Sequence, residues 1–443
     1  MMHITILQVL GRFNYSQVTF VIGGRRYSAK LVAQAMREHL EGSEGKRVEV
    51  ALLAPESLVV ELAETPDEAH ELLERGHRFC EEVAERVRES ELVSGDFKVL
   101  PVQSVGLHAG RGGGLTACFD NSLDNIVAYL LPDVIGLGMS GGSTLIADVS
   151  TGHNVYVAAL LEAVRAALVY HKLRGLLQGK RYAEAQVSVA PPIRGPGEYD
   201  VGVYEYDVKA FFEFPLKPHA SVSPLGLLSR EVRERVRDTD LASRLVSELR
   251  GQCRLIRELV SKARVAFNAI KYNVPLALFH RELVDLAEVE PRRGLEALFE
   301  ALNVIESERR VEVSGAELKV TRLRVDRPLV VNVALTMALL ESIKEFWASE
   351  VAPVRPKLEY IEETFGELYE RLGLGLNARF LSRDVRELLG QAGRGGVACS
   401  DVKRNFFAHS GLGRQQIEVE DSEVRYKEEA LSVIAEWLRS PER

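Results

Sequence analysis

The first half of the chain alternates short apolar runs with stretches whose apolar positions recur at helical spacing. The apolar runs predict strands at residues 4–10, 47–55, 97–105 and 143–150. The stretches between and after them predict helices at residues 27–41, 66–90, 120–131 and 154–177. Near-continuous apolar strands that alternate with helices are typical of a doubly wound, mostly parallel sheet. We therefore expect an α/β domain at the start of the chain.

The pattern changes after about residue 185. Strand-like segments surround a turn at residues 193–198 and predict a smaller sheet or hairpin, and residues 309–328 alternate like a second β-hairpin. The other segments have helical periodicity and lie at residues 229–272, 332–350, 356–372, 378–391 and 424–439. We divide the chain into a sheet domain (1–185), a connector of β-hairpin and helices (186–280) and a mainly α-helical domain (281–443).

Composition bounds the class of protein. A chain of 443 residues exceeds one ordinary core, and its 46% hydrophobic and 27% charged residues are those of a globular protein. No apolar run approaches the roughly 20 residues of a spanning helix, and the first residues lack a secretory leader, so we expect no membrane association. The cysteines are scattered without metal spacing, which predicts reduced thiols in a cytoplasm; they are Cys80, Cys118, Cys253 and Cys399. A net charge of −8 argues against a protein that coats nucleic acid non-specifically.

Near the end of the chain, the stretch "SDVKRNFFAHSG" sets three polar side chains among aromatic ones. On an ideal helix, Asn405 and His409 share a face and can hydrogen-bond, whereas Arg404 lies about 140° from His409. The two phenylalanines fall on the opposite side, where they suit a core. The spacing alone is unspecific in a chain rich in arginine, and a polar edge on a packed terminal helix explains it equally well.

The residue types are those that metal-free RNA cleavage requires. Histidine can take the proton of the 2′-hydroxyl or give one to the 5′-oxygen, and arginine can brace the charged phosphate. Asn405 could orient the imidazole. One copy gives an incomplete pocket, and two copies across a two-fold axis would give a cleft lined by two sets of Arg404 and His409.

A second candidate site follows the predicted strand that ends at residue 150. In open α/β sheets ligands bind beyond the carboxyl ends of the strands, where loop amides and helix N-termini attract phosphates. The residues expected there are Ser150, Thr151, Gly152, His153 and Asn154, with Asn14, Tyr15 and Ser16 of the loop after the first strand. An ordinary capped strand-to-helix turn is the alternative. A nicotinamide enzyme is disfavoured because no GxGxxG follows the first strand.

The stretch "RNFFAHSG" resembles the R-x4-6-H signature of HEPN ribonucleases, in which a polar residue commonly follows the arginine. The stretch "IADVSTGHN" is similar to the D-x-T-H-G segment of CRISPR-associated CARF proteins. Asp148 and Gly152 align with that segment, but Ser150 replaces its threonine, Thr151 its histidine, and His153 follows one place later. "NYSQVTFVIGGRRYSAKLVAQAM" also looks like the opening of these proteins.

The two resemblances together imply a Rossmann-like CARF domain followed by a HEPN domain with a small β-hairpin insertion. They imply an effector of type III CRISPR antiviral defence that cuts single-stranded RNA, with Arg404, Asn405 and His409 as catalytic residues. Its allosteric activator would be a cyclic oligoadenylate, tetra-adenylate being favoured over hexa-adenylate, bound by a homodimer or higher oligomer without any cofactor or metal. The alternative is a ligand-sensing transcription regulator that binds DNA through the arginine-rich helices of residues 229–272.

Overall fold

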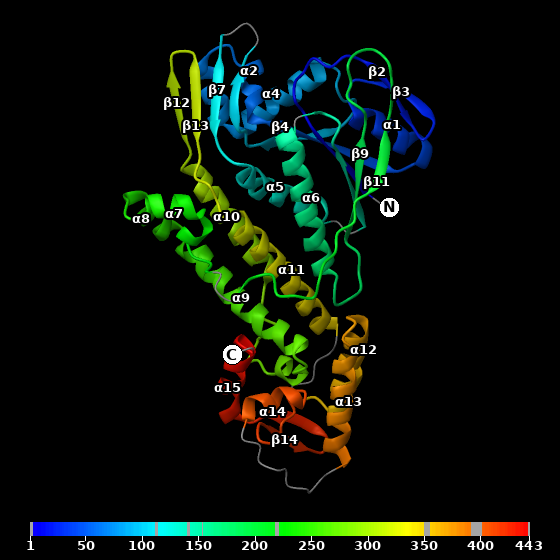
Figure 1. Ribbon diagram of the computed structural model, residues 1–443, viewed down its shortest axis with the longest axis vertical. Helices are drawn as coiled ribbons and strands as arrows, with labels where there is room; N and C mark the ends of the chain where they lie inside the picture. Colours follow the sequence, from blue (N-terminus) through cyan, green and yellow to red (C-terminus); the bar gives the residue numbers. More distant parts are fainter. Residues whose placement is uncertain are drawn as a thin grey trace.

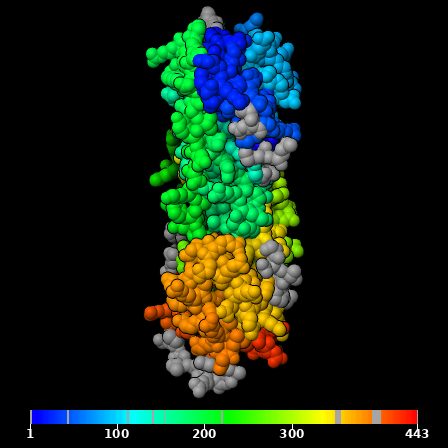
Figure 2. Space-filling model, turned by 90° about the vertical axis from the view of Figure 1, so that its right-hand side faces the viewer, coloured from blue at the N-terminus to red at the C-terminus, as the bar shows by residue number. Residues whose placement is uncertain are grey.

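The computed structural model describes residues 3–110, 114–139, 142–152, 154–217, 221–349, 355–390 and 401–441. Over these residues the molecule is elongated. A sheet domain stands at one end, long helices form the middle, and a smaller C-terminal domain stands at the other end (Figure 1). Figure 2 shows the same order from the side, from the blue N-terminal residues to the orange helices. The two candidate sites of the sequence therefore belong to different domains.

The sheet domain is built on six strands in the order β11-β9-β8-β1-β4-β5. All neighbours pair in parallel except β11, which runs antiparallel to β9. The strands are β1 (His3–Val9), β4 (Arg47–Pro55), β5 (Phe97–Val102), β8 (Ser143–Asp148), β9 (Ala183–Val189) and β11 (Gly202–Glu205). The predicted mostly parallel sheet is confirmed. The boundary expected at residue 185 falls inside β9, so the sheet domain extends into what we took for the connector.

Helices cover both faces of this sheet because each strand alternates its side chains. On β1, Ile4 and Ile6 belong to one core and Leu7 and Val9 to another. The first core holds the apolar faces of α1 (Val32–Glu44) and α4 (Gly76–Glu89), and the second holds those of α5 (Leu123–Leu137) and α6 (Asn154–Arg174). The α/β class predicted from the sequence is thus a three-layer arrangement.

A β-hairpin stands where part of the first helix was predicted. It consists of β2 (Val18–Ile22) and β3 (Arg25–Ala29), and helix α1 begins only at Val32. Gly23 and Gly24 form the two-residue turn with φ of 57° and 78°, a conformation that glycine adopts without steric cost. The short strand β10 (Glu198–Asp200) pairs with β2, so residues expected to form a separate hairpin instead join the sheet domain.

Two further predictions for the sheet domain were wrong in detail. The helix expected at residues 66–90 is two helices, α3 (Pro66–Glu74) and α4, because Arg75 leaves the helical conformation with φ −100° and ψ 74°. A short helix, α2 (Val59–Leu62), precedes them. Residues 106–119, where no element was predicted, contain β6 (Gly106–Ala109), which pairs with β7 (Thr116–Asp120).

The β-hairpin predicted at residues 309–328 is confirmed and has a structural role. Its strands are β12 (Arg310–Ser314) and β13 (Glu317–Thr321), and β13 pairs in parallel with β7 of the sheet domain. The result is a four-stranded sheet in the order β12-β13-β7-β6. A hairpin inserted between helices of the second half therefore attaches that half to the sheet domain.

A buried cluster of charges reinforces the attachment. We call it the Arg322 cluster, and it comprises Glu56, Glu306, Arg309 and Arg322. The Arg322 side chain is 1% exposed, and its guanidinium lies 2.6 Å from a carboxylate oxygen of Glu56 and 2.9 Å from one of Glu306. Burial raises the pKa of Glu306 even though Arg322 opposes it. A buried arginine between two carboxylates fixes the end of β13 against the end of β4.

The second half is mainly helical, as predicted. Its helices are α7 (Arg230–Val236), α8 (Asp240–Glu248), α9 (Arg250–Lys271), α10 (Pro291–Ser307), α11 (Arg327–Ser349), α12 (Leu358–Arg371), α13 (Gly375–Gly390), α14 (Val402–Ala408) and α15 (Glu428–Arg439). Two short strands, β14 (Ile417–Glu420) and β15 (Glu423–Tyr426), form a hairpin that the sequence did not predict. Asp421 and Ser422 at its turn both have positive φ.

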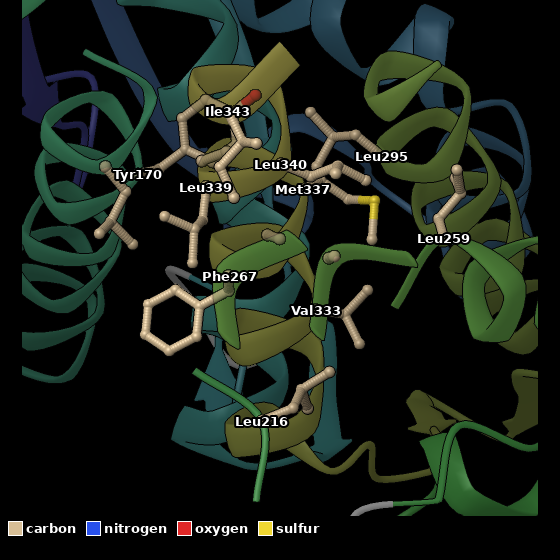
Figure 3. Close-up of a cluster of buried hydrophobic side chains, with 14 of the residues drawn as sticks. Tyr170, Leu216, Leu259, Phe267, Leu295, Val333, Met337, Leu339, Leu340 and Ile343 are labelled. Atoms are coloured by element: carbon tan, nitrogen blue, oxygen red, sulfur yellow. The ribbon is translucent and has the colours of Figure 1, made fainter. Parts of the chain in front are cut away.

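The long helices share one apolar core (Figure 3). Phe267 of α9, Leu295 of α10 and Met337 of α11 are buried in it, and Tyr170 of α6 joins them from the sheet domain. A Cβ atom placed on Gly294 would lie 2.5 Å from the Met337 sulfur, so α10 and α11 are in close contact. The core crosses both boundaries expected at residues 185 and 280.

Candidate functional site

Two loops leave the sheet side by side at one point of its edge. Strands β1 and β8 are neighbours, with Gln8 opposite Asp148. The chain proceeds from β1 to β4 on one side and from β8 to β9 on the other, so the strand order reverses between β1 and β8. Ligands of open α/β sheets bind in the crevice outside such a reversal. We call residues 10–17 and 149–152 the switch-point edge, and it is where the sequence predicted a ligand.

Asp148 and Ser150 form the base of this edge. The Ser150 hydroxyl donates to Asp148 Oδ1 at 2.7 Å and accepts the Ala190 N–H at 2.8 Å. The Ser188 hydroxyl donates to the same carboxylate oxygen at 3.0 Å. Full burial raises the pKa of Asp148 to about 6, against the lowering effect of these hydrogen bonds. Ser150 was predicted to contact the ligand, but its hydroxyl is occupied and ties β8 to the end of β9.

Thr151, Gly152 and Asn154 are better placed for a ligand. Thr151 Oγ1 is buried and has no hydrogen-bond partner among the described residues. Gly152 is exposed with φ 72°, and Asn154 is exposed at the start of the 21-residue helix α6. The N-terminus of such a helix carries a partial positive charge that favours phosphate. His153 lies outside the described residues.

The loop after β1 has one buried and several exposed positions. Phe13 is buried and anchors the loop, whereas Asn14 and Ser16 are exposed. The Tyr15 hydroxyl accepts the Gly11 N–H at 3.1 Å, and burial raises the pKa of Tyr15. Tyr15 thus shapes the loop from within, and the side chains open to a ligand are those on either side of it. Asn14 also lines a hollow of about 480 Å³.

The second site lies on the short helix α14. Asp401 begins it by accepting the Arg404 N–H at 2.9 Å, and Ala408 is its last residue. Phe406 is fully buried, with its ring 5.2 Å from that of Trp437, as expected for an anchor in the core. His409 follows the helix with φ −112° and ψ 40°. The backbone N–H of His409 still donates to the Asn405 carbonyl at 3.1 Å.

The imidazole contacts a carboxylate that the sequence did not single out. His409 Nδ1 lies 3.5 Å from Oδ1 of Asp384 on α13. The Asp384 side chain is 3% exposed, whereas that of His409 is 42% exposed. Asn405 was predicted to orient the imidazole, but the structure places Asp384 against Nδ1. The sequence offered no signal for it, because Asp384 precedes His409 by 25 residues on another helix.

Arg404 is exposed, and its guanidinium forms no hydrogen bond or ion pair within the part of the chain that the structure describes. His409 is half-exposed on the same short segment. An exposed cation and a partly accessible imidazole on one short segment can serve an anionic substrate. The arrangement can bind a phosphate and exchange a proton with it.

Residues 5–187 match the family model described as "CRISPR system endoribonuclease Csx1, CARF domain". The chain carries a Csx1-type CARF domain. The match begins in β1 and ends in β9, so it includes the whole switch-point edge. No curated protein matches the chain. The helical C-terminal region lies outside the matched residues, and its resemblance to HEPN ribonucleases stays a prediction.

A CARF domain indicates a CRISPR-associated protein that senses cyclic oligoadenylate. This ligand class agrees with the switch-point edge, where a buried unpaired hydroxyl and a helix N-terminus meet. The individual residues that contact the ring stay predictions. Asp148, at the base of the switch-point edge, has a role that the sequence did not predict. The structure shows that its carboxylate holds the loop through hydrogen bonds.

Within the described ranges, no group of three or more histidine, cysteine, aspartate or glutamate side chains could hold a metal ion. The same residues include no helix that is long and apolar enough to cross a membrane. Cys80, Cys118 and Cys253 are free thiols, and Cys399 lies outside the described residues.

Proposed function

We propose that this protein is a cyclic-oligoadenylate-activated, metal-independent endoribonuclease that cuts single-stranded RNA in type III CRISPR antiviral defence. One observation carries the nuclease assignment. A half-exposed histidine, His409, lies against the buried carboxylate of Asp384 and shares a short helical segment with the exposed Arg404. The CARF domain at the other end of the molecule supplies the activator class.

The chemistry follows from these groups. The His409 imidazole would accept the proton of the 2′-hydroxyl, whose oxygen then attacks phosphorus while the bond to the 5′-oxygen breaks. Arg404 would stabilise the extra negative charge of the pentacoordinate phosphate. The departing 5′-oxygen needs a proton from a second acid, which His409 of another copy can provide. The products would be a 2′,3′-cyclic phosphate and a 5′-hydroxyl.

Activation would begin at the switch-point edge. The ring would bind across two paired CARF domains, with Thr151 and Asn154 contacting its phosphates or riboses. The ring would bind two arrangements of the dimer with different affinities. The ratio of these affinities sets how far the cleavage activity can change. The helical domains would then bring two sets of Arg404 and His409 to one RNA strand.

The test of catalysis uses labelled single-stranded RNA with and without cyclic tetra- or hexa-adenylate. We expect cutting that depends on the ring, persists in EDTA and leaves 5′-hydroxyl ends. His409→Ala and Arg404→Ala should each reduce turnover strongly without loss of ring binding, because neither side chain belongs to the core. Cleavage that EDTA abolishes and Mg²⁺ restores, or an active His409→Ala variant, would contradict the mechanism.

The test of ring binding uses two variants of the edge. Thr151→Val, which removes only the hydroxyl, and Asn154→Ala should raise the ring concentration needed for half activation and leave basal cleavage unchanged. Ser243→Ala, on the exposed side of α8, is the matched control for the loss of a hydroxyl. Activation constants equal to that of the wild type would remove Thr151 and Asn154 from the ring site.

Part of the arginine set on which the alternative of a DNA-binding regulator depends is engaged within the molecule. Arg230 pairs with Glu234 at 2.9 Å, and Arg233 donates to backbone carbonyls that include that of Leu225 at 3.0 Å. Arg264 donates to the Leu216 carbonyl at 3.3 Å. These arginines are engaged within the molecule, as expected of structural side chains. DNA retention without RNA cutting would still select the alternative.

A further inference from the structure

Asp384 is a buried carboxylate held from three sides. The Ser410 hydroxyl donates to its Oδ2 at 2.7 Å, and the guanidinium of Arg383 donates to its Oδ1 at 2.9 Å and 3.1 Å. His409 Nδ1 faces the same Oδ1 at 3.5 Å. Burial of a carboxylate is costly unless such partners compensate for lost water. The imidazole is the one of these partners that the proposed reaction uses.

Ser410 is itself fixed by residues far away in the sequence. Asn273, just after α9, donates its side-chain amide to Ser410 Oγ at 2.9 Å and to the Asn377 carbonyl at 3.2 Å. Asn273 is 5% exposed and Ser410 is fully buried. Both have positive φ, of 59° and 53°. Non-glycine residues in this backbone region cost free energy and concentrate at functional sites.

Arg383 supplies positive charge to Asp384 and is itself held by other contacts. Besides Asp384, it donates to the Ala408 carbonyl at 3.4 Å and lies over the Phe380 ring at 5.2 Å from the centroid. Arg383 is therefore committed to α14 and α13, in contrast to the unpaired guanidinium of Arg404. A carboxylate shared by an arginine, a serine and a histidine has few free directions to move.

We propose that Asp384 is the positioning residue of His409. Its Oδ1 accepts the Nδ1–H of the imidazole, which leaves Nε2 free to exchange a proton with the RNA. Ser410 and Asn273 hold the carboxylate in place. The separation of 3.5 Å shortens when substrate binds, as is common for catalytic hydrogen bonds that are long in the free enzyme. This inference rests on the proposed nuclease function and assigns its missing orienting group.

The test compares Asp384→Asn with Asp401→Asn in the full chain at saturating ring. Asp401 is the matched control, because it begins α14 from outside and asparagine begins helices equally well. We expect Asp384→Asn to lower kcat by up to about 10,000-fold, the loss known for the orienting aspartate of a serine-protease triad, with KM within about twofold. Nitrogen-15 spectra of the imidazole should show that His409 no longer keeps its proton on Nδ1. Asp401→Asn should match the wild type.

Asn273→Gly is the second variant, in case Asp384→Asn fails to fold. Glycine keeps the positive φ of this position and removes the side-chain amide, which holds Ser410 and also contacts the Asn377 carbonyl. We expect a smaller loss of kcat, about 3- to 10-fold, again at unchanged KM. If His409→Ala abolishes cleavage but Asp384→Asn and Asn273→Gly retain the wild-type kcat and imidazole spectrum, the positioning role is wrong and the nuclease stands. An active His409→Ala variant would instead overturn the nuclease itself.

Discussion

Replacement of Asp148 by asparagine should make the stability of the CARF domain respond differently to pH. The wild-type carboxyl is fully buried among hydroxyl and amide donors, and its pKa rises from 3.8 to about 6. The folded protein therefore binds more protons than the unfolded chain between these two values. The protonated carboxyl contributes stability that is fully present below pH 3.8 and is lost as the pH rises through 6.

The size of the effect follows from the pKa difference. A pKa difference of about 2.2 units at about 1.36 kcal/mol each corresponds to about 3 kcal/mol of folding stability. The wild-type domain loses this stability at neutral pH, where Asp148 is ionised. Asparagine stays neutral and can accept from the Ser150 and Ser188 hydroxyls, but it loses the Ser150 N–H at 3.3 Å, worth about 1 kcal/mol. Asp148→Asn should thus be about 2 kcal/mol more stable than wild type at pH 7.5 and slightly less stable at pH 4.

Hydrogen exchange of the backbone amides in β8 and β9 measures this difference in stability next to Asp148. Tryptophan fluorescence would not, since Trp347 and Trp437 lie in helices α11 and α15. The protection of Asp148→Asn relative to wild type, corrected for intrinsic rates, should rise about 30-fold between pH 4.5 and 7.5. Asp238→Asn, at an exposed aspartate, should show no trend. A relative protection independent of pH would refute the argument that burial of Asp148 controls its titration.

Four further substitutions test the packing. Arg322→Met removes the buried cation of Glu56 and Glu306, which keep only the more distant Arg309, and should cost about 3–5 kcal/mol in urea unfolding, less at low pH. A loss below about 1 kcal/mol would mean that the cluster is hydrated. Phe406→Ala should cost about 3–5 kcal/mol because the ring is fully buried, and a melting temperature equal to wild type would contradict that. Gly175→Ala should destabilise, since its Cβ would lie 2.0 Å from a backbone carbonyl oxygen. A Cβ at Gly251 would meet no neighbouring atom, so Gly251→Ala should be neutral or stabilising by up to about 1 kcal/mol. Equal changes in stability for the two glycine variants would show that crowding at Gly175 does not matter.

The sequence predicted those parts of the fold that depend on neighbours along the chain. The apolar runs at β1, β4, β5 and β8 are local patterns, and the structure confirms these strands. It also shows helices between them, although the first begins later than predicted and the second is divided in two. Strand β7 was not predicted because its own apolar pattern is short. Its parallel partner, β13, lies about 200 residues later in the sequence. The Gly23–Gly24 turn carried a hairpin signal that the helix prediction overlooked.

The candidate sites show the same difference between local patterns, which the sequence reveals, and long-range contacts, which it does not. Arg404, Asn405 and His409 could be named from one short stretch, since consecutive residues on a helix have a known geometry. Asp384 and Asn273 could not, because they reach the imidazole and Ser410 only through tertiary packing, 25 and 137 residues away. At the switch-point edge, the place of Ser150 after a predicted strand indicated a ligand contact, whereas a nearby buried carboxylate and a backbone amide occupy its hydroxyl.

The distance between the two sites limits how a ring could control cleavage. Helix α6 starts at the switch-point edge and is 21 residues long, so it extends about 32 Å at about 1.5 Å per residue. Just beyond its end, the Leu177 N–H donates to Ser342 of α11 at 3.1 Å, and Arg371 of α12 donates to the Leu177 carbonyl at 2.5 Å. Helix α12 packs against α13, which carries Asp384. Because close-packed cores shift as rigid elements, we expect that a displacement at the switch-point edge would reach His409 along these helices or through a new arrangement of two chains.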